Sequence, residues 1–490
     1  MKHAWIRENG GKQMSLRAAR MRFSRMFIGD RAFYRQVVAI VLPIIIQNTF
    51  SNVVSLLDNV MVGRVGTLEM SAVAIVNQLL FIFNLCIFGG LAGPGIFATQ
   101  YAGAKDDEGI RHCFRIKWLF SLVMLICAFA IFLILPDKLI GIYLAEGTDA
   151  AAAASTLQYG REYLMIMLLG LVPFAVTQIY AGSLREVGET RLPMVASIVA
   201  ILVNLVFNYL LIFGKFGFPK LGVVGAALAT ALSRYVETLI IVIYTHAKKA
   251  QFTFIRGAYR SLYVPGRLIN DVLRRGTPLL VNEFFWSSGM AVLLQCYSVR
   301  GLDVVAACNI ASTVSNLFKV VFLSMGNAVA IMVGQALGAN RPDEAKQTVW
   351  KLMAASVASN IVMGFALFLL SPVIPHIYNT EPHVRHMAME MLWVVAVTMP
   401  VYAVAHCCYF TLRSGGRTVI TFIFDSGYTW GICVPVAYVL ANLTDMPIVP
   451  LYFAVQALEV VKIIIGVIMV EKGVWIRNII ADVPAKGDVC

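Results

Sequence analysis

Two carboxylates lie inside long apolar runs of the chain, where an ionised side chain is costly. Glu283 stands about eleven residues into the run 272–299, and Asp58 stands toward the outer end of the run 37–62. A charge at the centre of a bilayer costs about 2.5–3.5 kcal/mol on insertion scales, so such residues are rare and usually functional. Either group could bind a proton or Na⁺ and release it. The alternatives are a structural ion pair of Glu283 with Lys319, and an interfacial Asp58 that caps the outer loop.

Amide and hydroxyl side chains accompany both carboxylates. Gln47, Ser51, Ser55 and Asp58 recur along one stripe of a helix, which predicts a face turned toward a cavity. Asn204 and Asn208 also share a helix face and could coordinate Na⁺ or substrate, or hydrogen-bond between helices. The side chains expected to line the path of substrate or cation are Gln47, Asn48, Ser51, Asn77, Asn204, Asn208, Asn282 and Lys319.

Four further sites of charge or proton chemistry are weaker candidates. Asp425 could line the cytoplasmic mouth or pair with Arg413 or Arg417, and we interpret it as structural. His406 could carry a proton, but a histidine on an apolar helix more often packs and hydrogen-bonds. The pairs Arg234 with Glu237 and Glu459 with Lys462 are each three residues apart, which predicts local ion pairs.

The elements that position these residues are membrane-spanning helices. Of the 490 residues, 59% are hydrophobic and only 14% are charged, far from the composition of a soluble domain. Apolar stretches of about 20 residues can cross the hydrocarbon core. We predict twelve spans, at 37–62, 72–99, 114–135, 160–182, 193–213, 222–246, 272–299, 304–335, 352–372, 388–411, 419–441 and 448–471.

The distribution of basic residues predicts the orientation. If the amino terminus is cytoplasmic, 30 of the 40 Lys and Arg residues fall in cytoplasmic segments and seven in outer loops. Basic residues stay on the cytoplasmic side of a membrane. We therefore expect both termini in the cytoplasm and a multi-pass protein of the cell (inner) membrane. The same bias explains the net charge of +13 without a nucleic-acid partner.

The two halves of the chain repeat each other. At an offset of 235 residues Pro43 matches Pro278, and Gln100-Tyr-Ala-Gly-Ala matches Gln335-Ala-Leu-Gly-Ala; after a slip, Leu184-Arg185 matches Leu412-Arg413. Six spans per half is an even number, so the repeats are parallel, an arrangement found in secondary transporters. The predicted fold is an all-α membrane protein with two six-helix bundles. Its expected parts are a basic tail (1–36), an N-lobe (37–246), a cytoplasmic linker (247–271), a C-lobe (272–472) and a second cytoplasmic tail (473–490).

Several motifs resemble a known family. Leu42-Pro43-x-x-x-Gln47-Asn48, Asp58-Asn-Val-Met-Val-Gly63 and Ala72-Val-Ala-x-x-Asn77-Gln78 are similar to the start of multidrug and toxin extrusion (MATE) transporters. Pro278-x-x-x-Asn282-Glu283 and Leu412-Arg-Ser-Gly-Gly416-Arg-Thr418 agree in the second half. The resemblance covers about residues 37–472.

The resemblance implies an antiporter that exports cationic or amphipathic organic compounds in exchange for H⁺ or Na⁺ by alternating access. It implies a C-lobe cation site at Glu283 and a coupling role for Asp58 in the N-lobe. Many members carry Asn and Asp four apart on the fifth span, whereas this chain has Asn204 and Asn208. An N-lobe pair of carboxylates is therefore in doubt.

Two other functions stay open on the sequence. A flippase for lipid-linked precursors would call for a wide cationic cavity, and only Lys319 of the basic residues lies deep in a span. A membrane-embedded enzyme would use Asp58 and Glu283 as acids, but no His/Cys/Asp cluster has metal-ligand spacing. No P-loop motif is present. We expect no cofactor besides the coupling ion, a small organic cation as substrate, the lipid bilayer as surroundings, and a monomer.

Overall fold

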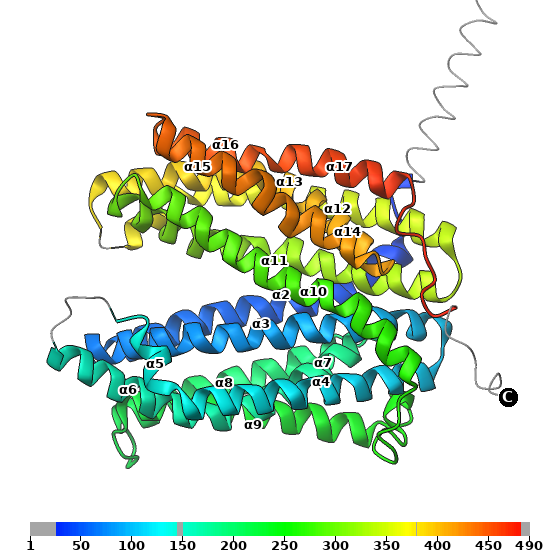
Figure 1. The fold of residues 1–490 in the computed structure, drawn as a ribbon, viewed down its shortest axis with the longest axis horizontal. Coiled ribbons are helices and arrows are strands. Elements are labelled where there is room, and N and C mark those ends of the chain that lie inside the picture. The colour runs from blue at the N-terminus through cyan, green and yellow to red at the C-terminus, as the bar shows by residue number, and fades with distance from the viewer. Residues whose placement is uncertain (1–25, 145–149, 379, 482–490) are drawn as a thin grey trace, which may run out of the picture.

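The computed structural model describes residues 26–144, 150–378 and 380–481, and the described part is helical (Figure 1). The first bundle, the N-lobe, contains α2 (Arg31–Gly63), α3 (Thr67–Ala104), α4 (Asp107–Ile134), α5 (Pro136–Gly141), α6 (Ala150–Leu169), α7 (Leu171–Glu186), α8 (Arg191–Phe213) and α9 (Gly222–Ala247). The second, the C-lobe, contains α10 (Gly266–Ser298), α11 (Leu302–Gly338), α12 (Pro342–Leu370), η2 (Ile374–Ile377), α13 (Pro382–Ser414), α14 (Thr418–Phe422), η3 (Ile423–Gly427), η4 (Thr429–Cys433), α15 (Val434–Leu443), α16 (Ile448–Ala457) and α17 (Glu459–Glu471).

Eleven described helices are long and apolar enough to cross a membrane, and a bent pair raises the number to twelve. The bent pair is α6 with α7, which meet at an angle of 44°. The sequence predicts one span there, at 160–182. The bend has a local cause: Pro173 has no N–H to donate to the carbonyl of Leu169, so the regular hydrogen-bond ladder is interrupted next to Gly170.

The eleventh span contains two consecutive π-helical turns. They are η3 and η4, between α14 and α15, and they include Asp425 and Trp430. Pro435 follows at the start of α15 and cannot donate a backbone hydrogen bond, so the helix adjusts on its amino-terminal side. π-Helical turns inside helices are common at functional sites because they re-aim side chains.

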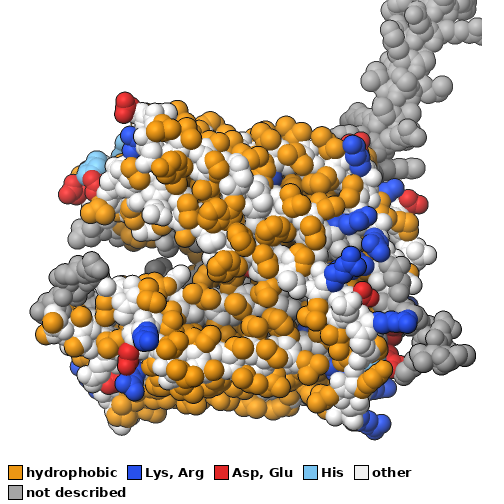
Figure 2. All heavy atoms as spheres, in the orientation of Figure 1, with side chains coloured by type: hydrophobic (Ala, Val, Ile, Leu, Met, Phe, Trp, Pro, Cys, Tyr) orange, Lys and Arg blue, Asp and Glu red, His pale blue; other side chains and the backbone are white. Residues whose placement is uncertain are grey.

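The two lobes meet at one end of the molecule and separate at the other. On the face drawn in Figure 2, Lys and Arg side chains gather mainly at the end where the lobes touch, which we call the basic end. A hollow separates the lobes at the opposite, open end. Helix α3 contacts α10 and α11 across the boundary. Small residues permit this approach, since a Cβ at Gly93 would come within 2.7 Å of the Gly276 Cα.

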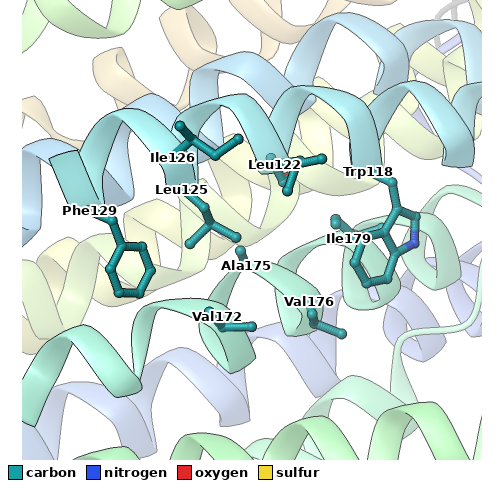
Figure 3. Close-up of a pocket in the computed structure, with 10 residues that line it drawn as sticks. Trp118, Leu122, Leu125, Ile126, Phe129, Val172, Ala175, Val176 and Ile179 are labelled. Carbon is teal, nitrogen blue, oxygen red and sulfur yellow. The ribbon is translucent and has the colours of Figure 1, made fainter.

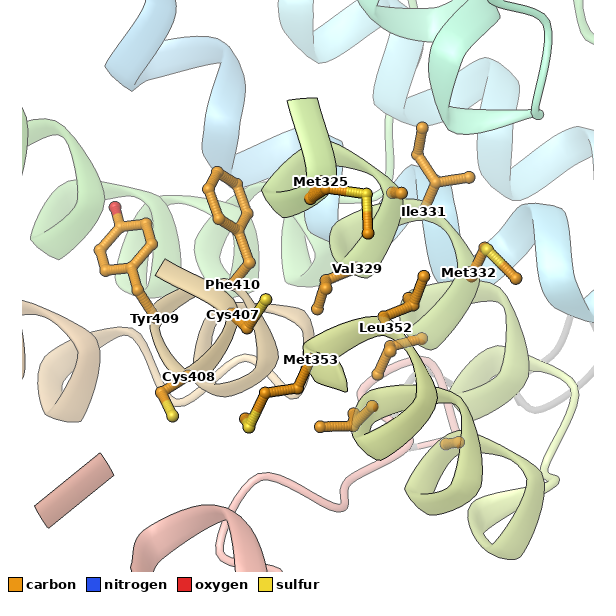
Figure 4. Packing of buried hydrophobic residues seen from close by; sticks show 14 of the residues in the cluster. Met325, Val329, Ile331, Met332, Leu352, Met353, Cys407, Cys408, Tyr409 and Phe410 are labelled. Carbon is orange, nitrogen blue, oxygen red and sulfur yellow. The ribbon is translucent and has the colours of Figure 1, made fainter. Parts of the chain in front are cut away.

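Two apolar cores secure the basic end. One joins α11, α12 and α13 to the first turns of α2, including Val37 and Ile44; Figure 4 shows part of it around Met325, Phe410 and Cys407. The other joins α3, α4, α7 and α8 to the start of α10 through Leu268 and Val272. The first helix of each lobe therefore begins against the opposite lobe.

The segment between the lobes is folded rather than extended. The sequence predicts a linker at 247–271, whereas α9 ends at Ala247 and α10 begins at Gly266, with the short helix η1 (Thr253–Ile255) between them. Phe252 and Phe254 of this segment are buried. The Arg115 guanidinium on α4 donates hydrogen bonds to the carbonyls of Gly257, Ala258 and Tyr263 at 2.9–3.1 Å.

Candidate functional site

A carboxylate and two amides converge inside the N-lobe. Asn208 on α8 donates to the Asp58 carboxylate on α2 at 2.6 Å and to the Asn204 side-chain oxygen at 3.1 Å. In the other orientation of its amide, with the nitrogen turned toward Asp58, Asn204 no longer accepts from Asn208. It then donates to both Asp58 carboxylate oxygens at 3.0 and 3.1 Å, and its oxygen accepts from Thr230 on α9 at 3.3 Å. Three helices thus bring together the side chains that the sequence singles out on two of them.

One oxygen of this cluster has no partner. Asn208 is buried, and its side-chain oxygen makes no hydrogen bond with the described residues. A buried polar atom without a partner costs free energy, so it marks a place where an ion or a water molecule would be stabilised. The Asp58 carboxylate is bonded to the amide nitrogen of the same Asn208 side chain, and the Thr230 hydroxyl is bonded to Asn204. We call these four residues the N-lobe cluster.

A second cluster lies in the C-lobe and contains a buried ion pair. Lys462 on α17 contacts Asp425 at 2.9 Å and Glu459 at 3.6 Å. Asn282 on α10, only 1% exposed, donates to Asp425 at 3.1 Å and accepts from the Ser426 hydroxyl at 2.7 Å. The predicted pair of Glu459 with Lys462 is present, but as one side of a larger network.

The structure corrects the expectation for Asp425. Its ion-pair partner is Lys462, not Arg413 or Arg417, because η3 directs the carboxylate toward α10 and α17. The prediction for Arg234 and Glu237 is also wrong. Arg234 donates to the Gly170 carbonyl at 3.2 Å and lies 5.1 Å above the ring of Phe174, with no ion pair to Glu237 within 4.0 Å.

Glu283 lies at the contact between α10 and α3, where the lobes meet. A Cβ at Gly89 of α3 would come within 3.2 Å of the Glu283 Cγ. Within the described residues, neither Glu283 nor Lys319 has an ion-pair partner within 4.0 Å, so they do not neutralise each other here. The charges that act on Glu283 are Arg413 and Asp425. His406 stacks against Tyr409 and meets Phe322 and Phe410 edge-on.

The remaining predicted residues lie apart from the clusters. Gln47 accepts a hydrogen bond from Arg185 of α7 at 2.9 Å. Ser51 donates to the Gln47 backbone carbonyl, and Asn77 accepts from Tyr163 at 3.4 Å. Asn48 is half-buried on α2.

A cavity of about 140 Å³ lies between the lobes near the basic end, and none of its charged side chains is among those predicted to line the substrate path. Lys117 and Glu186 form a pair at 2.5 Å within it. Arg185 and Arg413 line it from opposite lobes. The sequence does carry a signal for Arg185 and Arg413, because they occupy equivalent positions of the internal repeat. We call this space the floor cavity.

A larger cavity of about 440 Å³ is of another kind. It lies between α4 and α7 and is lined almost wholly by apolar side chains, among them Leu122, Phe129 and Val172 (Figure 3). Leu122 and Val172 are exposed, as expected for a surface that faces lipid tails. Ser121 is its one polar lining side chain among those described.

This protein has two parallel six-helix lobes with buried charge clusters and a hollow between them. Such an architecture is typical of membrane transporters. A family model named MatE matches residues 43–210 and 278–439. The chain therefore belongs to the multidrug and toxin extrusion (MATE) family of efflux transporters.

Relatives and solved structures agree with this family. The chain is 28% identical over 417 residues to the probable multidrug resistance protein NorM of Bacillus anthracis, covering 84% of this chain and 89% of that protein. It is 26% identical over 439 residues to the probable multidrug resistance protein YoeA of Bacillus subtilis, covering 88% and 92%. A solved structure described as the outward-facing conformation of a multidrug resistance MATE family transporter of the MOP superfamily has a TM-score of 0.82 at 20% identity, covering 91% and 96%.

The family decides between the open alternatives. MATE proteins are membrane transporters, so the enzyme hypothesis is excluded. The comparisons do not favour the flippase. They leave the coupling ion and the substrate class to be inferred from the site.

Proposed function

We propose that this protein exports cationic or amphipathic organic compounds in exchange for H⁺ or Na⁺. The observation that carries this proposal is the N-lobe cluster: a carboxylate held by two amides, with one buried amide oxygen left without a partner. Asp58 would bind the cation, while Asn208 and Thr230 would complete its oxygen surroundings. Asn204 would hold the carboxylate in position.

Glu283 is the second coupling residue in this proposal. Its position at the contact of α10 with α3 supports the role, because a group at the moving boundary can favour one lobe arrangement when it takes up a cation. Arg413 is the neighbouring positive charge, and it would repel a cation that arrives at Glu283. Asp425 is already neutralised by Lys462 and would be structural.

The basic end is the cytoplasmic end in this proposal, since basic residues stay inside. Both termini then lie in the cytoplasm of a cell with the protein in its inner membrane. The hollow between the lobes would open outward, and substrate loading would require the basic end to part. We propose a monomer as the working unit, which light scattering after size exclusion in detergent would check.

Ethidium efflux from proteoliposomes tests the function. Efflux is measured with an imposed pH gradient or an imposed Na⁺ gradient, for the wild-type protein and for Glu283→Gln. The proposal predicts efflux driven by one gradient and lost in the variant. Full antiport in Glu283→Gln would contradict the role of Glu283, and no efflux under either gradient would contradict the substrate class.

A further inference from the structure

The segment that follows α17 begins in the C-lobe. Trp475 is fully buried in the core formed by α11, α12 and α13, and its indole N–H donates to the Val470 carbonyl at 3.0 Å. Gly415, just after α13, packs so closely on Trp475 that a Cβ there would overlap its carbonyl. This part of the segment is therefore fixed to the C-lobe.

Four residues later the same segment is buried in the N-lobe. Ile479 is 1% exposed and belongs to the apolar core that joins α3, α4, α7 and α8 of the N-lobe to the start of α10, against which Ile480 also packs. The segment thus crosses from one lobe to the other at the basic end, where it is drawn in red beyond α17 in Figure 1. We call residues 473–481 the strap.

Gln100 of α3 fastens the strap to the N-lobe by its side chain. Its amide nitrogen donates to the carbonyl of Arg477 at 3.2 Å, and its oxygen accepts from the backbone N–H of Ile479 at 2.9 Å. The same nitrogen donates to the carbonyl of Ser414 at the end of α13, at 3.0 Å. Gln100 is fully buried, so losing these bonds without replacement would be costly.

The internal repeat shows what the strap adds. Gln335, the counterpart of Gln100, donates to the carbonyl of Glu186 at the end of α7 at 2.9 Å, just as Gln100 donates to Ser414 at the end of α13. Gly103 and Gly338, also counterparts, pack against the backbones of Gln335 and Gln100. These contacts close the basic end in a nearly two-fold manner, and the strap joins only one half of them.

We propose that the strap is a latch that holds the basic end closed. It connects the core of one lobe to the core of the other, so the lobes cannot part there while Trp475 and Ile479 both stay in place. A contact that exists in one state alone shifts the equilibrium toward that state. The latch therefore sets the balance between the two lobe arrangements. The inference rests on the proposed alternating access.

Two isoleucines of the strap provide a matched test. Ile479→Ala removes the side chain that is buried against α3, α4, α7 and α8, whereas Ile476→Ala removes one that packs on the core around α11, α12 and α13. Spin labels at Lys249→Cys and Lys346→Cys, both exposed at the basic end and one on each lobe, report the separation of the lobes. Exposed native cysteines are replaced beforehand, and pulsed electron resonance gives the distance distribution in proteoliposomes with and without ethidium.

The measured quantity is the ratio of the population with the longer distance to the population with the shorter one. We expect this ratio to rise about tenfold in Ile479→Ala and to stay near the wild-type value in Ile476→Ala. A chain ending at Asn478, which lacks Ile479 but keeps Trp475, should behave like Ile479→Ala. Wild-type distances that respond to ethidium but are unchanged by Ile479→Ala and by the truncation would overturn the latch and leave the proposed function standing. A single distance in every protein and condition would overturn both.

Discussion

At the scale of residues, the two lobes handle buried charge in different ways. The N-lobe surrounds Asp58 with neutral donors, Asn204 and Asn208, and has an unpartnered amide oxygen beside it. The C-lobe neutralises Asp425 with Lys462 at 2.9 Å. A carboxylate held by amides can exchange its cation, whereas one in a buried ion pair already has a fixed one. In the proposed function, this difference separates the coupling site at Asp58 from the structural pair at Asp425.

Asp58→Asn should abolish gradient-driven efflux, because an amide cannot neutralise the charge of a bound cation or carry the exchanged proton. The side chain keeps its size, so insertion and folding should be preserved. Initial rates of ethidium efflux check this, with Asp445→Asn as the control, since Asp445 is exposed at the open end. Efflux within a factor of two of wild type in Asp58→Asn would place coupling elsewhere.

Lys462→Met should lower the free energy of unfolding by about 3 kcal/mol, since it leaves the Asp425 carboxylate buried without its ion-pair partner. Adding Asp425→Asn removes the orphaned charge while keeping a group that can bond to Asn282, and should recover most of the loss. Denaturation in detergent micelles measures both. A double variant as unstable as the single one would contradict a purely structural pair.

Sequence reasoning could find the carboxylates but not their surroundings. Asp58, Asn204 and Asn208 were recognisable because polar residues are rare inside apolar runs. The partner of Asp425 was not, because it depends on how two π-helical turns rotate the eleventh span. Lys117 stands only a few residues into the predicted span 114–135, and it is buried against Glu186. Only packing distinguishes a charge at a helix end from one inside the lobe.

At the scale of elements, small residues decide where the lobes can touch. Gly103 and Gly338 hold positions where a Cβ would overlap the opposite backbone, and Gly93 meets Gly276. The repeat makes Gly103 and Gly338 visible in the sequence as counterparts, but not their function. The bend at Gly170 was hidden for another reason: apolar composition predicts the length of a span and not its straightness.

Gly103→Ala should prevent closure of the basic end, because the added methyl group would overlap the Gln335 carbonyl. The measurement is the rate at which a membrane-impermeant thiol reagent, added to the basic side, modifies an introduced cysteine. In Gly103→Ala, a cysteine at half-buried Gln178 in the floor cavity should react faster than it does without that substitution. A cysteine at exposed Lys346 should react at the same rate with and without it. Gly141→Ala is the control, since a Cβ there meets nothing within 4 Å. Equal rates at Gln178 in all three proteins would show that the close approach is dispensable.

At the scale of the whole molecule, the internal repeat predicts two parallel six-helix lobes. The described residues have this architecture, and the hollow lies between the lobes (Figure 2). Which end is closed could not be predicted, because the proposed alternating access requires a sequence that is compatible with two lobe arrangements of similar free energy. The closed state described here depends on contacts between residues hundreds of positions apart, such as Gln100 with Ile479.

The proposed exchange of substrate for cation is tested most directly by running it backwards. Proteoliposomes with no initial H⁺ or Na⁺ gradient receive an ethidium gradient, and internal pH and internal Na⁺ are recorded together. We expect one of these ions to move opposite to ethidium, and this movement to be lost in Asp58→Asn. Ethidium movement with neither ion following would contradict cation-coupled antiport.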